Sequence, residues 1–213
     1  TTNLDVTLDA IGNVTWKSGV GSYSYHATKR RAVIAAGANS YGYDANGNLT
    51  SRNGNSISYT SYNLPGVINA GTNSSTLSYG AWRNRYKQVA ITGGSTETTI
   101  SVAGLLEKVT KGSVTEYRHR IAATPGVVAL YTRRSSGSPL TDTYYLHRDH
   151  LGSPERISRA DGTALVGLSF SGYGERRDTD WEGPIGSTDL ATLGATTREG
   201  YTGHAMLDSV GLV

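Results

Sequence analysis

The sequence predicts an all-β protein made of antiparallel strands and hairpins. Glycine is abundant, at 27 of 213 residues, and the aromatic residues are mostly tyrosine, with 14 tyrosines, 3 tryptophans and 1 phenylalanine. Glycine allows the positive φ angles of tight turns, and tyrosine is favoured in half-buried strands. A short strand-like segment also recurs along the chain, and no long segment shows convincing helical periodicity.

The recurring segment places two large residues two positions apart, and the second of them is a tyrosine. Because alternate residues of a strand lie on the same face, each copy predicts a strand whose large side chains pack against neighbouring strands. The second tyrosines follow one another at intervals of 18, 16 and 20 residues. The copies are Tyr23–His26, Tyr41–Asp44, Ile57–Thr60 and Leu77–Gly80.

Turn sequences separate the strand-like runs. Asp9–Thr15 and Asp44–Thr50 share one arrangement, an aspartate followed by a glycine three positions later and then an asparagine. Aspartate and asparagine bond back to their own backbone, so each arrangement predicts a turn between two strands. Further strands are expected at Tyr86–Thr92, Thr98–Val102, Val114–Ile121, Val127–Arg133, Thr143–His147, Glu155–Arg159 and Ala164–Phe170.

Asp178–Glu199 interrupts this regularity. Its Gly- and Thr-rich sequence predicts a long loop or lid, either a plain connection or a binding loop. At most, Asp189–Leu193 is expected to hold one helical turn, and Ala103–Val109 another.

Composition and charge exclude several classes of protein. Apolar residues make up 37% and charged residues 17%, which suits a packed core and not a disordered tail. The net charge of +3 comes from small scattered basic groups, interpreted as solvated turns and strand edges, so no nucleic-acid partner is expected. Cysteine is absent, which excludes disulfides and thiolate metal sites. The longest apolar runs, such as Gly126–Leu130, are too short to span a membrane.

The two ends of the sequence predict a piece of a longer polypeptide. Thr1–Asp5 contains neither an initiator methionine nor a signal-peptide pattern, and the last residues carry no terminating cap.

Tyr144–Pro154 contains the strongest suggestion of catalytic or metal chemistry. His147, Asp149 and His150 match the end of the His-x-His-x-Asp-His run of metallo-β-lactamase-type hydrolases, but Tyr145 occupies the place of the first histidine. The favoured interpretation is therefore structural, with the aspartate accepting hydrogen bonds from turn N–H groups and a histidine packed against the tyrosines. A metal site would need further ligands, for which the candidates are His119, His204 and Asp208.

Other reaction classes lack their motifs. Ser153, beside His150, could be imagined as a nucleophile, but the adjacent Gly152 and Pro154 favour a turn. The sequence contains no Gly-x-Ser-x-Gly, P-loop, His-Glu-x-x-His or dinucleotide-binding glycine pattern. No catalytic, metal-binding or cofactor-binding residue is therefore assigned, and no cofactor is expected.

Tyr43–Thr50 resembles the YD repeat of bacterial Rhs proteins and their relatives, the C components of ABC-type toxin complexes and the teneurins. Tyr144–Pro154 resembles the signature that opens the Rhs-associated core, and Phe170–Arg177 and Gly200–His204 follow in the order of that family. The resemblance divides the chain into YD-repeat strands over residues 1–142 and a truncated core segment over residues 143–213. It assigns a structural role to Tyr43, Asp44, Gly47, Asn48, Tyr145, Asp149, His150, Gly152 and Ser153.

The resemblance implies a β-strand ribbon that spirals into a hollow shell around a toxic C-terminal polypeptide. Family members often end the core with an aspartyl autoprotease built on paired Asp-Pro motifs, but this sequence contains no Asp-Pro pair, so no enzymatic activity is expected. The implied partners are other segments of the same polypeptide, the enclosed toxin, and a delivery or immunity protein. The implied location is bacterial, with synthesis in the cytoplasm followed by export or delivery to a target cell.

The alternative interpretation is a cell-surface adhesin or carbohydrate-binding module. Tyrosine and tryptophan rings stack on sugars, and repeated sheets offer broad platforms for them. A tyrosine ladder within the protein is nevertheless the favoured role for these side chains.

Overall fold

The computed structural model describes residues 5–124, 126–181 and 183–211, and nearly all of them belong to antiparallel strands and the turns between them. The chain divides into two compact units, Thr1–Gly71 and Thr72–Val213, which we call unit 1 and unit 2. The predicted boundary between residues 142 and 143 does not coincide with this division and stays a prediction. The predicted all-β class, with antiparallel strands and hairpins, is confirmed.

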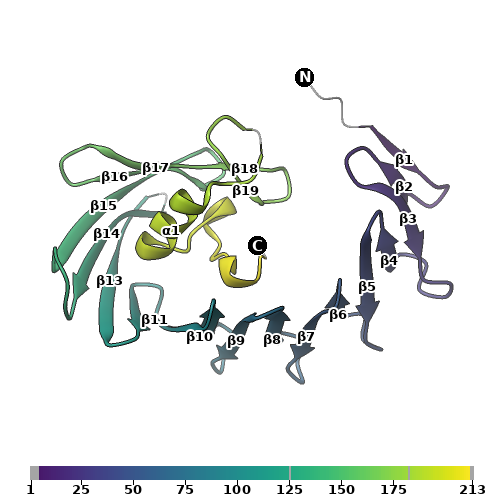
Figure 1. Ribbon diagram of the computed structural model, residues 1–213, viewed down its shortest axis with the longest axis horizontal. Coiled ribbons are helices and arrows are strands. Elements are labelled where there is room, and N and C mark those ends of the chain that lie inside the picture. The colour runs from purple at the N-terminus through teal and green to yellow at the C-terminus, as the bar shows by residue number, and fades with distance from the viewer. Residues whose placement is uncertain (1–4, 125, 182, 212–213) are drawn as a thin grey trace. The chain divides into compact units, whose positions relative to one another are not determined.

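Unit 1 is a succession of short strands, each antiparallel to the next (Figure 1). In the three pairings that contain the second tyrosines of the first three repeats, the register shifts at those tyrosines, Tyr25, Tyr43 and Tyr59. Such a bulge bends a strand locally, here just before the turn. The strands are β1 (Val6–Leu8), β2 (Val14–Lys17), β3 (Gly21–Tyr25), β4 (Val33–Ala36), β5 (Asn39–Tyr43), β6 (Leu49–Arg52), β7 (Asn55–Tyr59) and β8 (Pro65–Ala70).

Unit 2 continues the pattern with longer strands, again paired in chain order. All seven later strands predicted from the sequence are present, although the last of them is divided between β17 and β18. The strands are β9 (Asn73–Tyr79), β10 (Arg85–Thr92), β11 (Ser95–Val102), β12 (Leu106–Lys111), β13 (Val114–Ala123), β14 (Gly126–Arg134), β15 (Thr141–Arg148), β16 (Pro154–Arg159), β17 (Ala164–Gly167) and the small pair β18 (Ser169–Phe170) and β19 (Arg176–Arg177).

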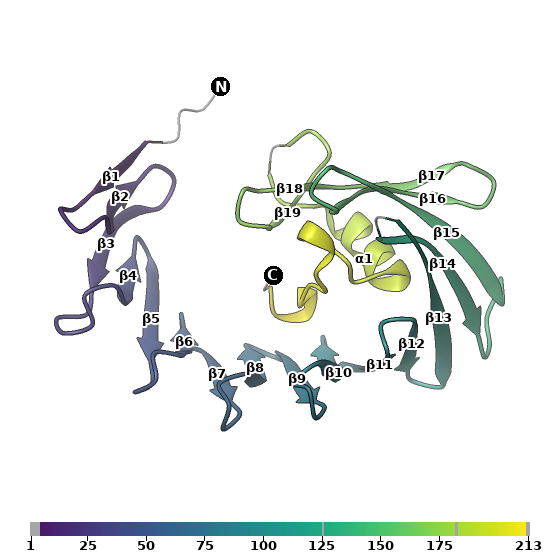
Figure 2. The same cartoon turned by 180° about the vertical axis from the view of Figure 1, so that it is seen from behind.

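The segment after β19 forms a second layer on unit 2. It holds α1 (Ser187–Thr196), the 3₁₀ turn η1 (Tyr201–Gly203) and the 3₁₀ turn η2 (Asp208–Val210). The strands β13 to β17 curve around α1, as both views show (Figures 1 and 2). The principal apolar core lies there and consists of Ile157, Val166, Leu168 and Leu193.

Two local predictions were wrong. The loop expected over residues 178–199, with one helical turn at Asp189–Leu193, contains a ten-residue helix that includes this turn. The helix forms because it buries Leu193 completely against the sheet. Threonine and glycine are weak helix formers, so propensity does not reveal α1, and tertiary packing decides it. The helical turn expected at Ala103–Val109 is replaced by β12, which begins at Leu106. Within the described residues, no helix is long and apolar enough to cross a membrane.

Candidate functional site

The aspartate turns are built alike along the chain. In the turn after β5, Asp44 accepts hydrogen bonds from the Asn48 backbone N–H and side-chain amide, both at 2.8 Å. Gly47 supplies the left-handed residue of this turn, with φ of 88°. The Asn48 amide also holds the pKa of the Asp44 carboxyl below its ordinary value of 3.8. Asp9 forms the equivalent turn in the first copy.

In the first three repeats the second tyrosine anchors a strand through its hydroxyl group. Tyr43 lies on β5 and donates a hydrogen bond of 2.9 Å to the carbonyl oxygen of Val33 on β4. Tyr25 and Tyr59 make the same contact, 11 and 10 residues back along the chain. Burial raises the pKa of the Tyr43 hydroxyl, which therefore stays a donor at neutral pH. The repeated tyrosine is thus a link between neighbouring strands.

Three of the four repeats lack the aspartate, and in two of them another side-chain acceptor replaces it. His26 accepts hydrogen bonds at Nδ1 from the backbone N–H groups of Thr28 and Lys29, at 3.3 and 3.2 Å. Thr60 accepts one at Oγ1 from the N–H of Leu64, at 3.1 Å. The fourth repeat has Gly80 at this position, and its turn is closed by a backbone hydrogen bond of 3.0 Å from the Gly80 N–H to the Asn84 carbonyl oxygen. A side-chain acceptor after the tyrosine is therefore common in these turns but not required.

The same turn follows β15. Asp149 Oδ1 accepts from the N–H groups of Leu151 and Ser153, at 2.9 and 2.8 Å, and Gly152 has φ of 85°. Tyr145 and His150 are exposed to solvent. The structure therefore places Asp149 and Gly152 in a turn.

The histidines considered as metal ligands make other contacts. His147 hydrogen-bonds Ser158 at 2.9 Å, His119 packs against the Tyr131 ring, and His204 hydrogen-bonds a neighbouring threonine. Across the described ranges, no three His, Asp or Glu side chains are grouped as metal ligands. Ser153 is 1% exposed and accepts a hydrogen bond from the Thr202 N–H at 3.0 Å. Ser153 thus joins the turn after β15 to η1.

Arginine side chains of unit 2 bind the segment after β19, which we call the C-terminal segment, to the sheet. Glu199, which is 2% exposed, forms ion pairs with Arg120 of β13 and Arg148 of β15. Arg148 also donates to the Val127 and Gly152 carbonyl oxygens, at 2.8 and 2.7 Å. Burial lowers the pKa of Arg148, and the nearby positive charge of Arg120 lowers it further. The Glu199 carboxylate between the two arginines offsets the positive charge of both.

Two further arginines hold the same segment. Arg176 is 4% exposed and donates to the Arg198 and Glu199 carbonyl oxygens and to Asp208 at 3.1 Å. Arg198 forms an ion pair with Glu97 of β11. The interpretation of the scattered basic groups as solvated turns and strand edges is therefore wrong for Arg176, because a carboxylate and backbone carbonyls compensate its buried charge.

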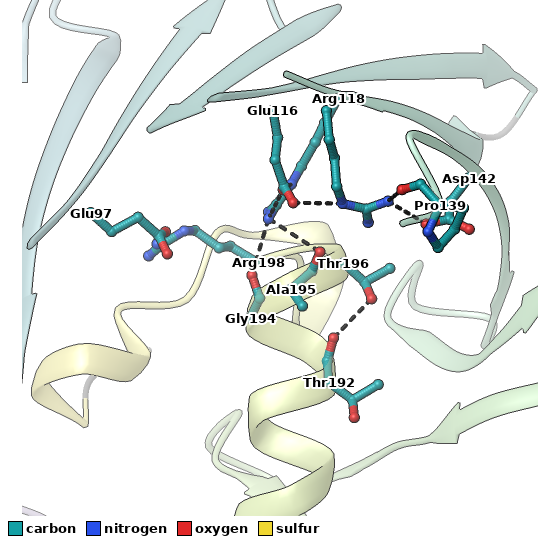
Figure 3. Close-up of polar contacts among 11 residues, drawn as sticks. Glu97, Glu116, Arg118, Pro139, Asp142, Thr192, Gly194, Ala195, Thr196 and Arg198 are labelled. Carbon is teal, nitrogen blue, oxygen red and sulfur yellow. Dashed lines mark hydrogen bonds and ion pairs between the residues drawn. The ribbon is translucent and has the colours of Figure 1, made fainter. Parts of the chain in front are cut away.

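Arg118 of β13 completes this arginine network, which we define as Arg118, Arg120, Arg148, Arg176 and Arg198. Its guanidinium group bonds Glu116 and donates to the Gly194 and Ala195 carbonyl oxygens, both at 3.2 Å, at the end of α1 (Figure 3). A positive charge at the C-terminal end of a helix also interacts favourably with the helix dipole. Sequence reasoning missed the network because its partners lie up to 101 residues apart and follow no local pattern.

Solved structures of a Tc holotoxin pore and of TcdB2–TccC3 resemble this chain. The crystal structure of TcdB2–TccC3 gives a TM-score of 0.58 at 11% identity, covering 98% of this chain and 15% of that one. The chain has the fold of a segment of these complexes. TcdB2–TccC3–Cdc42 gives 0.57 at 12% identity, over 98% and 15% of the two chains. A Photorhabdus luminescens Tc holotoxin pore gives 0.55 at 11% identity, over 94% and 14%.

These likenesses establish the fold alone, and the chain spans about 15% of the length of the first structures that it matches. No protein-family profile and no curated protein sequence matches the chain.

Proposed function

We propose that the chain is a wall segment of a bacterial Rhs-type shell that encloses a toxic polypeptide before delivery. The observation that carries this proposal is the likeness to toxin-complex structures over 98% of the chain. The ordered Rhs-like sequence signatures support it independently, because the fold comparison does not depend on them.

The proposed mechanism is enclosure, and no enzymatic step is assigned to this chain. Consecutive antiparallel pairing satisfies the strand backbones, the tyrosine hydroxyls link strands, and side-chain acceptors close the turns. Residues 1–142 would supply repeat strands and residues 143–213 the start of the core. Tyr43, Asp44, Gly47 and Asn48 would be structural residues of the first part, and Tyr145, Asp149, His150, Gly152 and Ser153 of the second.

The proposed partners follow from enclosure. They are other segments of the same polypeptide, the enclosed toxin, and a delivery or immunity protein. The polypeptide would be made in the bacterial cytoplasm and then exported or delivered.

Protease protection tests the proposal. The natural polypeptide that contains this chain is digested with proteinase K, and its enclosed region should survive much longer than the same region produced alone. Glu199→Ala should shorten that survival, because it releases the C-terminal segment of unit 2, whereas the exposed Glu175→Gln should not. Equal digestion rates for the enclosed and the free region would contradict the proposal.

The adhesin or carbohydrate-binding alternative depends on tyrosines that are free to stack on sugars. Tyr25, Tyr43 and Tyr59 instead use their hydroxyl groups to link strands. A glycan array distinguishes the two functions: micromolar binding that is lost on substitution of exposed tyrosines such as Tyr145 would favour the alternative.

A further inference from the structure

A cleft of about 560 Å³ lies in unit 2 between the C-terminal segment and strands β10 to β13. Its volume is within the range of roughly 300–1,000 Å³ typical of ligand sites. Small apolar side chains line part of it, among them Ala90, Val109 and Ala191. Charged and hydroxyl side chains line the rest, so the cleft combines an apolar surface with a few polar groups.

Three residues that line this cleft carry buried donors without a partner. Arg118 Nη1, Arg198 Nε and Ser209 Oγ are buried and have no hydrogen-bond partner among the residues that the structure describes. All three residues line the cleft, and Arg118 is only 2% exposed. Both guanidinium groups lie beside the C-terminal end of α1 (Figure 3). Because an unmade hydrogen bond is costly for a buried donor, these groups favour a ligand that brings acceptors.

The charges favour an acidic ligand. Arg118 is paired with Glu116, and Arg198 with Glu97. The third carboxylate that lines the cleft, Asp208, is paired with Arg176. Lys111 of β12 also lines the cleft, is exposed, and forms no ion pair with any described residue. Its uncompensated positive charge attracts a carboxylate to the cleft.

We propose that this cleft binds an extended acidic peptide segment. One aspartate or glutamate carboxylate of the segment accepts from Arg118 and Lys111, and its backbone carbonyls accept from Arg198 and Ser209. Separated donors beside an apolar surface suit a peptide, which carries a carbonyl at every residue and small side chains between them. The inference rests on the proposed function in one respect, since the bound segment would belong to the enclosed polypeptide.

Peptide binding to the 213-residue chain tests the inference. The probe is fluorescently labelled Ala-Gly-Glu-Gly-Ala with blocked ends, measured by fluorescence polarisation beside the same peptide with glutamine. The glutamate peptide should bind at least about tenfold more tightly than the glutamine peptide, because only its carboxylate matches the free positive charge. Equal affinity of the two peptides, or no binding of either up to millimolar concentration, would overturn the proposal.

Two variants locate the binding without touching the arginine network. Ala191→Trp should abolish binding by filling the cleft from the exposed face of α1, and Lys111→Ala should weaken it a few-fold. Lys108→Ala is the matched control, because this exposed lysine lies on the same strand but on the face opposite Val109 and Lys111. An equal loss in Lys108→Ala and Lys111→Ala would show non-specific attraction and would contradict the inference.

Two further results separate the possible explanations. Acetate should displace the peptide only weakly, and acetate binding as tight as the peptide would identify a simple carboxylate site and exclude the peptide proposal. If the natural polypeptide protects its enclosed region from protease while the cleft binds no peptide, this inference is wrong and enclosure stands. If the cleft binds the glutamate peptide but protection is absent, enclosure is wrong and the peptide site stands.

Discussion

Units 1 and 2 use the same strand-and-turn repeat but are stabilised differently. In unit 1 the side-chain hydrogen bonds join residues close in sequence, such as Asn13 and Arg30, which are 17 positions apart. In unit 2 they reach 79 positions from Arg120 to Glu199 and 101 from Glu97 to Arg198. Local links are therefore sufficient to form the ladder of strands, whereas the second layer depends on contacts that only the completed fold supplies.

The difference extends to the apolar core. Ala36 and Ile68 are the buried apolar residues in the described part of unit 1, and Leu8 and Trp16 are exposed there at 61% and 40%. Unit 2 completely buries Ile157 of β16 and Leu193 of α1 in the core between α1 and the sheet. Since a sheet needs a second layer to bury its apolar face, unit 1 should have much the lower free energy of local unfolding.

Among the variants, Leu193→Ala should have the largest effect on stability, and the effect should be confined to unit 2. It removes a fully buried side chain from the core between α1 and the sheet, so unit 2 should lose about 4 kcal/mol of stability. Urea unfolding gives the loss, and amide hydrogen exchange shows where it falls. The exposed Leu151→Ala is the control and should stay within about 0.5 kcal/mol of the parent chain. Faster exchange in β1 to β8 as well would contradict the separation of the two units.

Glu199→Ala should have the second largest effect. It should lower the stability of unit 2 by about 3 kcal/mol, because it leaves Arg148 in a largely buried site without a carboxylate. The partial exposure of Arg120 and its second partner, Glu107, keep the effect below that of Leu193→Ala. Hydrogen exchange should quicken in β13, β15 and the segment after α1. Glu175→Gln provides the comparison with an exposed glutamate, and an equal loss there would remove the special role of Glu199.

Tyr43→Phe should destabilise unit 1 by about 1 kcal/mol, because it removes one hydrogen bond to the Val33 carbonyl and leaves the ring in place. The matched control is Tyr41→Phe, from a tyrosine of the same strand whose hydroxyl makes no hydrogen bond within the described part of the chain. Hydrogen exchange of β4 and β5 reports the effect. If both variants lose the same stability, the tyrosine hydroxyl does not link the strands.

Acidification should give the smallest effect, in the turn after β5. Because folding lowers the pKa of Asp44, its contribution is present above the ordinary aspartate value of 3.8 and is lost as pH falls through the lower, folded value. The melting temperature of the parent chain should therefore fall as the pH is lowered below 3.8, and NMR titration of the Asp44 carboxyl should show the lowered pKa. Asp44→Asn should lack part of this acid dependence, and identical curves for the two proteins would refute the assignment.

Sequence reasoning predicted the turns and strands, which depend on neighbouring residues, and missed the contacts between residues far apart in the sequence. The Asp44 turn and the strand at Tyr86–Thr92 follow from turn chemistry and alternation, which act over a few residues. Helix α1 mixes leucine and alanine with threonines and a glycine that form helices weakly, and the packing of Leu193 on the sheet reveals it. The pairing of Glu199 with Arg120 and Arg148 has no sequence signal, because nothing in a single sequence relates positions so far apart.

The cleft could not be predicted from the sequence either, because its walls come from distant parts of the chain. Lys111 and Val109 share a strand face, which alternation predicts, but the opposing wall comes from α1. Arg118 has no neighbour in sequence that marks it as buried, and its position at the end of α1 is known only from the fold.

Pairing in chain order also bears on how the protein is made. Every strand of unit 2 that receives the C-terminal segment precedes that segment in the chain, so a ribosome synthesises Arg120 and Arg148 before Glu199. Hairpins can therefore assemble one after another during translation, with little loop entropy to overcome at each step. A whole hairpin could then be gained or lost in evolution without altering the pairing of the others, so the length of such a protein can vary while its architecture is kept.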